Sequence, residues 1–146
     1  MKYTFDKMYL SAAQKNLGTL FQFALCNIKD TPEDFQKTFE DSIVAHQIEI
    51  ANPNYLCGKS GIELALSIYG EQKVEPLIKK ALDEPYRPEA EYWSGWVLSY
   101  YQWNSDIPFK KIFTFYSLRQ LLDGYHLLHE ADISKTVEIM DEARGK

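Results

Sequence analysis

The segment Glu91-Tyr-Trp-Ser-Gly-Trp-Val-Leu-Ser-Tyr-Tyr-Gln-Trp103 decides the fold of this chain, and it holds all three of its tryptophans. As a helix, it carries a broad apolar stripe at three- and four-residue steps, formed by Trp93, Trp96, Val97, Tyr100 and Trp103. The remaining strip is small or polar, and Gly95 within it would let a second backbone approach closely. Because aromatic side chains bury large areas, we expect this helix to be buried on most sides and to form the centre of the molecule.

The composition indicates one globular domain. The chain has 146 residues, of which 45% are hydrophobic and 25% charged, and these values are typical of a soluble globular protein. A chain of this length can bury about two-thirds of its unfolded surface in one core. We therefore predict that residues 1–146 form a single helical domain.

Two helices are predicted in the N-terminal third of the chain. The first covers about 7–27, with Asp6 as its cap. At Gly18 either a neighbour packs tightly or the helix is locally weak. The second begins at Thr31-Pro32, where a threonine cap precedes a proline at the first helical position. Its apolar residues keep helical spacing to about Ala51.

Shorter helices are predicted in the rest of the chain. The Asn52-Pro53-Asn54 tripeptide marks a turn. Ser60 and Glu63 form a capping box for a helix that Gly70 ends, and the prolines of Pro85-Tyr-Arg-Pro88 mark a linker into the aromatic helix. Further helices are expected near 75–82, 108–113, 117–124 and 132–144. The predicted fold class is therefore all-α, a compact single-domain bundle of about six to eight helices around a central aromatic helix.

The net charge of −5 is concentrated between Asp30 and Ile50, where six acidic residues stand against a single lysine. An acidic helix surface can attract a basic partner, but it is also common on an ordinary solvated helix, and both interpretations stay open. Nucleic acid is not expected as a partner, because affinity for phosphates comes from Lys and Arg clusters. The acidic residues considered for partner contact are Glu33, Asp34, Glu40 and Asp41.

The cysteine content and the N-terminus predict the compartment. Cys26 and Cys57 are too few and too far apart for a cysteine-based zinc site or a disulfide framework, which fits a reducing compartment. The first residues lack the apolar core of a signal peptide. No run of uncharged apolar residues approaches the length of about 18 that is needed to span a membrane. We therefore expect a cytoplasmic protein without membrane contact.

Metal-capable side chains are dense in one place only, at His126, His129, Glu130 and Asp132. A zinc-binding helix needs a second histidine four residues after the first, and none follows His129 at that spacing. Three interpretations stay open: a structural role that ties the last helix to the aromatic one, a partner contact, or acid–base chemistry by His129 and Glu130. Because no nucleophile with an adjacent base and no glycine-rich nucleotide loop is evident, we predict no catalytic site, no metal and no cofactor.

An alternative function follows from the two short helices over about 109–124, whose tight connection is typical of a helix-turn-helix. Lys110, Lys111 and Arg119 are the basic residues of this segment. A recognition helix usually has more phosphate anchors and base-reading side chains than these. DNA binding or transcription regulation through 109–124 is therefore kept as the alternative.

Three runs of residues resemble a bacterial protein family: Tyr92-Trp93-x-Gly95-Trp96-x-Leu98-x-Tyr100-Tyr101-Gln102-Trp103, Phe109-Lys110-x-Ile112, and Leu128-His129-Glu130-Ala131-Asp132-x-Ser134-Lys135. Members of that family are small cytosolic proteins encoded beside ADP-ribosyltransferase-like toxins, and they look like the antitoxins of those toxins. Asn52-Pro53-Asn54-Tyr55 and Gly58-x-Ser60-Gly61-x-Glu63-Leu64-Ala65 also fit the family, so the resemblance covers roughly Asn52 to the C-terminus, apart from 70–88. One position departs from the pattern, since His126 stands where a proline is expected before the Leu-His-Glu-Ala-Asp turn.

The resemblance implies a non-enzymatic antitoxin that binds a cognate protein toxin and blocks its active site. In this hypothesis the acidic second helix raises the rate of association with a basic toxin surface. Exposed parts of the aromatic helix and the 129–135 segment make or support the contact, although for each aromatic residue a place in the core is favoured over a place at the interface. A homo-oligomer stays open. Beside the four acidic residues, the expected contact residues are Tyr101, Gln102, His129, Glu130, Asp132 and Lys135.

Overall fold

The computed structural model describes residues 7–84 and 89–145, and within these ranges the chain folds into helices without strands. The predicted all-α fold class is confirmed. Two predictions, the Asp6 cap and the 85–88 linker, lie outside the described residues.

Ten α-helices and one π-helical turn follow one another along the described residues. They are α1 (Lys7–Gln22), the π-helical turn η1 (Phe23–Asn27), α2 (Pro32–Glu40), α3 (Ile43–Glu49), α4 (Pro53–Leu56), α5 (Gly61–Tyr69), α6 (Glu71–Asp83), α7 (Ala90–Ser105), α8 (Phe109–Phe115), α9 (Leu118–Leu128) and α10 (Ile133–Arg144). The aromatic segment is α7, close to its predicted bounds.

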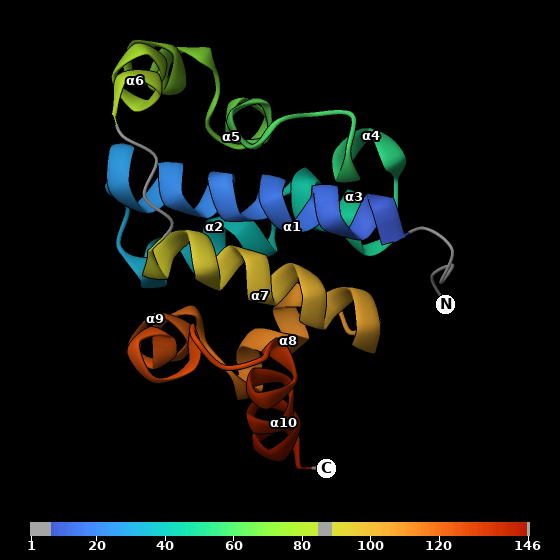
Figure 1. Cartoon of the computed structure of the whole chain (residues 1–146). Coiled ribbons are helices and arrows are strands. Elements are labelled where there is room, and N and C mark those ends of the chain that lie inside the picture. The colour runs from blue at the N-terminus through green and yellow to red at the C-terminus, as the bar shows by residue number, and fades with distance from the viewer. Residues whose placement is uncertain (1–6, 85–88, 146) are drawn as a thin grey trace.

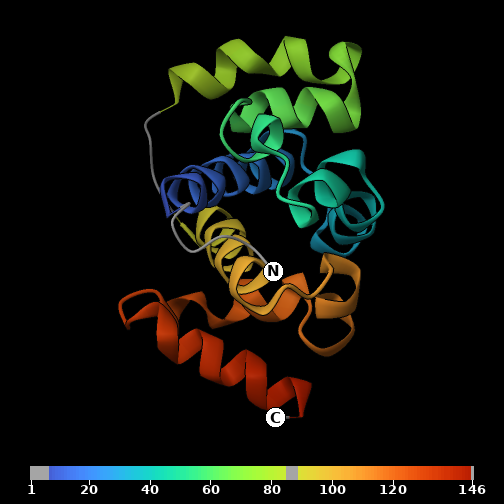
Figure 2. The ribbon, with the colours of Figure 1, turned by 90° about the vertical axis from the view of Figure 1, so that its right-hand side faces the viewer.

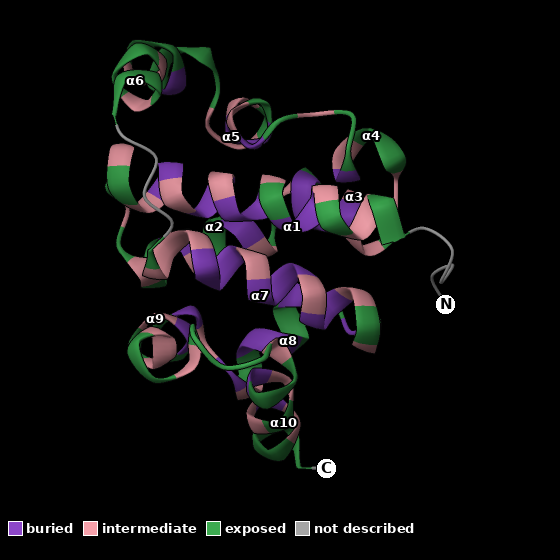
Figure 3. Cartoon of the chain, viewed as in Figure 1, coloured by how far each residue is buried: buried purple, intermediate pink, exposed green. Residues whose placement is uncertain are grey.

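Helices α1 and α7 lie side by side through the middle of the molecule (Figure 1). Helices α5 and α6 cover the side of α1 that faces away from α7, and α10 lies at the opposite end of the molecule from them (Figures 1 and 2). Buried residues are concentrated along α1 and α7, whereas α6 and α10 are mostly exposed or half-buried (Figure 3). The central pair is thus the core to which the other helices attach.

The contact between α1 and α7 joins the two backbones directly at two glycines. A Cβ atom added at Gly95 would lie 2.4 Å from the backbone oxygen of Leu17 and 3.0 Å from Cα of Gly18. A Cβ atom at Gly18 would lie 2.9 Å from the ring of Tyr92. The expected close backbone at Gly95 is confirmed, and of the two alternatives for Gly18 the structure shows the tightly packed neighbour. At Gly95 no side chain can separate the helices, because the packed interior has no room for one.

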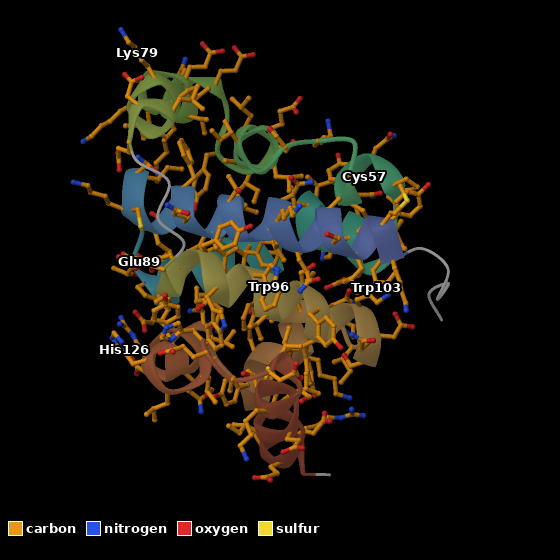
Figure 4. All side chains as sticks on the ribbon, viewed as in Figure 1. Cys57, Lys79, Glu89, Trp96, Trp103 and His126 are labelled. Atoms are coloured by element: carbon orange, nitrogen blue, oxygen red, sulfur yellow. The ribbon has the colours of Figure 1, made fainter. Side chains whose placement is uncertain are left out.

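The small and polar strip of α7 is more deeply buried than two of its indoles. Ser99 is 3% exposed and Gln102 is 1% exposed, whereas Trp96 and Trp103 are only half-buried. Figure 4 shows both labelled tryptophans on α7. The small residues allow the close approach to α1, so the large rings pack at the flanks of the contact, where there is space for them.

Helix α5 packs against α1 through a third glycine. A Cβ atom at Gly61 would lie 2.5 Å from Cβ of Thr19 and 2.7 Å from the backbone oxygen of Asn16. Helix α1 is therefore held between two neighbours that both approach it through glycine.

Four fully buried phenylalanines connect α1 to α2 and α8. The ring of Phe21 meets the rings of Phe35 and Phe39 edge to face, with centroids 4.8 and 5.1 Å apart. Phe39 in turn meets Phe109 at 4.9 Å. Edge-to-face pairs of this kind contribute about 1 kcal/mol each beyond their area burial.

The predicted continuous second helix is wrong, because the chain breaks at Asp41 and Ser42. The Ser42 hydroxyl donates to the backbone oxygen of Phe39 at 2.7 Å and accepts from the backbone N–H of Ala45 at 3.1 Å. One side chain thereby both ends α2 and caps α3, which a pattern of apolar residues does not reveal.

Other boundaries differ less. The predicted Asn52-Pro53-Asn54 turn leads into the short helix α4, which Asn52 caps. The last 5 residues of the predicted first helix form the π-helical turn, and α6 begins before its predicted start, with Pro76 inside it. The Ser60–Glu63 capping box is confirmed.

Within residues 7–84 and 89–145, no helix combines the length and apolar character needed to cross a membrane.

Replacing Gly95 with alanine should lower the free energy of unfolding by about 1–3 kcal/mol, because the new methyl group would overlap the Leu17 carbonyl. The matched control is Gly124→Ala in α9, where a Cβ atom would meet a side-chain methyl of Leu128 at 3.2 Å and alanine favours the helix. Urea unfolding measures both variants. If Gly95→Ala were as stable as Gly124→Ala, the backbone contact would not constrain the fold.

Candidate partner-binding surface

Two of the four predicted acidic contact residues form ion pairs within the chain. The Glu33 carboxylate accepts hydrogen bonds from Arg119 Nε at 3.0 Å and Nη2 at 3.1 Å, which lower the pKa of Glu33. Asp41 Oδ1 lies 3.3 Å from Lys110 Nζ. Water and salt screen both pairs, since all four side chains are exposed. The pairs nevertheless direct these carboxylates toward α8 and α9 of the same molecule.

Asp34 and Glu40 are the acidic residues that these two ion pairs do not include. Asp34 is exposed in the first turn of α2, where its backbone N–H donates to Thr31 Oγ1 at 3.1 Å. Glu40 is half-buried. Burial raises the pKa of Glu40, and the charge of Asp41 raises it further, against the opposite effects of Lys110 and Lys37.

Side chains of α2 and α3 also cap two helices that come much later in the sequence. The backbone N–H of Phe109 donates to Glu49 Oε2 at 2.7 Å, and that of Leu118 donates to Gln36 Oε1 at 2.9 Å. These N–H groups open α8 and α9, where no carbonyl of the same helix can accept them. The acidic segment therefore has a structural role that the sequence did not indicate.

Tyr101 and Gln102 are each only 1% exposed, so the expectation that they are exposed contact residues is wrong. The Tyr101 hydroxyl donates to Asp141 Oδ1 at 2.7 Å. Burial and then the Asp141 carboxylate raise the pKa of Tyr101 to about 12, with Arg144 acting in the opposite direction. The reason is tertiary, because α10 packs against α7 and the local sequence of α7 contains no sign of that neighbour.

The turn between α9 and α10 is the third predicted contact region, and we call residues 125–135 the α9–α10 corner. The ring of His129 stacks on that of Tyr125, with centroids 4.2 Å apart and an interplanar angle of 19°. His129 Nδ1 lies 2.7 Å from the backbone oxygen of Tyr125. Tyr125 meets Trp93 of α7 edge to face at 5.8 Å. These rings tie the corner to the aromatic helix, which is the structural role considered for His129.

The charged residues of the α9–α10 corner lie at the surface. Glu130 Oε1 is 3.7 Å from His129 Nε2. Asp132 caps α10 by accepting from the backbone N–H of Ser134 at 3.0 Å. Hydrogen bonding with the Ser134 side chain, and then this backbone bond, lower the pKa of Asp132. Lys135 Nζ lies 3.9 Å from Glu138. The structure therefore brings the four contact residues predicted for 129–135 together on one exposed turn.

Sequence reasoning missed Leu127 as a surface residue of the corner. Its exposed fraction of 86% is the largest among the large apolar side chains of the described chain. Helix α9 buries Leu118 and Leu121 and half-buries Leu122 and Tyr125, and these four keep helical spacing. Leu127 falls outside that stripe, so the periodicity of α9 did contain a signal for its exposure.

The basic residues of the alternative DNA-binding segment are partly engaged. Lys110 and Arg119 form the ion pairs with Asp41 and Glu33, and Lys111 is exposed. Two of the three cations that could meet phosphates are thus already close to carboxylates. DNA binding stays a prediction.

Metal-ligating and nucleophilic side chains are dispersed. Cys26 and Cys57 are free thiols, and burial, followed by the charges of three nearby carboxylates, raises the pKa of Cys26 to about 11. In the part of the chain that the structure describes, no group of three or more His, Cys, Asp or Glu side chains could hold a metal ion.

No protein-family model, curated protein or solved structure matches this chain.

Removing the Tyr101 hydroxyl should loosen α10. Tyr101→Phe should lower the free energy of unfolding by about 1–2 kcal/mol, because Asp141 loses its donor while the ring still fills the core. Hydrogen exchange should become faster over 133–144 and stay unchanged in α5. Tyr100→Phe, in the same helix, is the matched control. Equal exchange of α10 in both variants would show that the hydroxyl does not hold this helix.

The raised pKa of Tyr101 should make stability fall at alkaline pH. An unfolded tyrosine ionises near its ordinary pKa of 10.0, whereas folded Tyr101 ionises near 12, so the unfolded state loses the proton first. The contribution of Tyr101 to the free energy of unfolding should therefore be complete below pH 10 and should be lost between about pH 10 and 12. The pKa values of Tyr69 and Tyr116 are also raised, so Tyr101→Phe should reduce the decline without abolishing it. Chemical unfolding across this range measures the slope, and identical slopes would refute this assignment.

Proposed function

We propose that this chain is a non-enzymatic, antitoxin-like protein that binds and neutralises a cognate ADP-ribosyltransferase-type toxin. The family resemblance of the runs at 92–103, 109–112 and 128–135 supports the proposal. The observation that carries it is the α9–α10 corner, where Leu127 is 86% exposed beside the segment that the resemblance singles out.

The corner has the composition of a small protein contact. An exposed leucine can enter an apolar pocket of a partner, and the exposed charged residues Glu130, Asp132 and Lys135 follow it within the same corner. Protein interfaces commonly combine an apolar centre with such a polar rim. The stack of His129 on Tyr125 holds the turn in place, so little conformational freedom is lost on binding.

Because of the internal ion pairs, the second predicted helix is no longer the place where we expect a basic partner to be attracted. Glu33 and Asp41 of the second predicted helix already face cations of the same chain. Near Leu127, exposed Asp123, Glu130 and Asp132 outnumber Lys135. A basic toxin surface would therefore be attracted to the corner, and such attraction acts mainly on the association rate.

The proposal is tested with the ADP-ribosyltransferase-type protein encoded by the adjacent gene. Co-purification of the two proteins and rescue of growth on co-expression are expected. Failure of both would end the antitoxin interpretation. Tight, salt-sensitive binding of the isolated chain to its own promoter in a gel shift would favour the DNA-binding alternative instead.

Leu127→Glu should weaken toxin binding at least about tenfold, because a charge would enter the apolar centre of the contact. Met8→Glu is the matched control: Met8 is 82% exposed and lies at the start of α1, far from α9 in Figure 1. Calorimetric titration gives the two dissociation constants. If both variants bound as tightly as the wild type, the contact would lie elsewhere on the molecule.

A further inference from the structure

A cavity of about 260 Å³ opens where α1, α5 and α6 meet, and we call it the α1–α6 groove. Its apolar lining includes Phe23, Ile62 and Ala81, and its polar lining includes Gln22, Asn27 and Glu84. The volume is close to the lower end for small-molecule sites, which also combine an apolar lining with a few polar groups. The groove lies at the C-terminal end of α1, and α1 and α7 separate this side of the molecule from α9 and α10 (Figure 1).

The π-helical turn shapes this groove. Its wider hydrogen bonding, with the backbone N–H of Ile28 donating to the oxygen of Phe23 at 2.9 Å, lets Phe23 point into the core while Asn27 stays at the surface. Asn27 Nδ2 donates to Glu84 Oε1 at 3.2 Å, which links the turn to the end of α6. Single π-helical turns are frequent at functional sites.

The electrostatics of the groove favour a cation. Of the described residues that line it, Glu84 alone carries a charge. Burial raises the pKa of the neighbouring Cys26 thiol, and the charges of Glu91, Glu89 and Glu84 raise it further, so carboxylates other than Glu84 also lie near the groove. Figure 4 shows Glu89 at this end and Lys79 extending outward from α6.

We propose that the α1–α6 groove binds a small organic cation with an apolar body, such as an amidinium or guanidinium group on a ring or alkyl chain. The charged end lies at the Glu84 carboxylate, and the apolar body lies over Phe23, Ile62 and Ala81. Asn27 orients the carboxylate through its hydrogen bond. This site is independent of toxin binding, because it involves none of the residues of the α9–α10 corner.

The test compares benzamidine with benzamide, which has nearly the same shape but no charge. In titrations of the ¹⁵N-labelled full chain at low salt, benzamidine should give saturable shifts at the amides of Asn27, Ile62 and Ala81, and it should bind about fivefold more tightly than benzamide. Glu84→Gln should remove the preference. Glu75→Gln, an exposed carboxylate on the same helix that does not line the groove, should retain it.

Two outcomes would overturn the proposal: benzamidine shifts that do not saturate, or equal affinity for the charged and the neutral compound in the wild-type chain. An unchanged preference in Glu84→Gln would likewise exclude the assigned carboxylate. Two further probes distinguish the source of the cation. Tighter binding of agmatine than of a doubly capped arginine supports a free small molecule, and the reverse supports an arginine side chain presented by a protein.

Discussion

The contact of α1 with α7 at Gly18 and Gly95 is the constraint on which the rest of the structure depends. Two helices that meet backbone to backbone have no interior space between them, so the large aromatic residues of α7 pack at its flanks. Trp93 there meets Tyr125, and Tyr125 carries the stacked ring of His129. These ring contacts fix the α9–α10 corner relative to α7. The rings lie at the flank of α7 because its contact with α1 has no room for large side chains.

A second set of constraints comes from polar side chains that act across long stretches of sequence. Gln36 and Glu49 accept the first backbone N–H groups of α9 and α8. Because a helix start buried without an acceptor is unfavourable, these contacts set where the two helices begin on the surface of α2 and α3. The Glu33–Arg119 pair reinforces the same alignment from an exposed position. Several carboxylates between residues 30 and 50 therefore bind groups of the same chain.

The two proposed binding regions differ in what they offer. The α9–α10 corner presents Leu127 on a turn stiffened by stacked rings, which suits contact with a preformed surface of another protein. The α1–α6 groove is a cavity with one carboxylate beside an apolar lining, which suits a small charged group. The groove lies on the side of the central helix pair that α5 and α6 cover, and the corner lies on the side of α9 and α10 (Figure 1), so one chain has room for both.

The sequence by itself determined the helical class, the central place of the aromatic segment, the close contact at Gly95 and several caps, because these depend on local periodicity and on side chains within one turn of the backbone they bind. It also placed the four predicted contact residues from His129 to Lys135 on one turn. Only the tertiary structure decided that Tyr101 is covered by α10 and that Glu33 and Asp41 meet cations of α9 and α8. These contacts join residues far apart in the chain, so no local pattern of α7 or α2 could contain them.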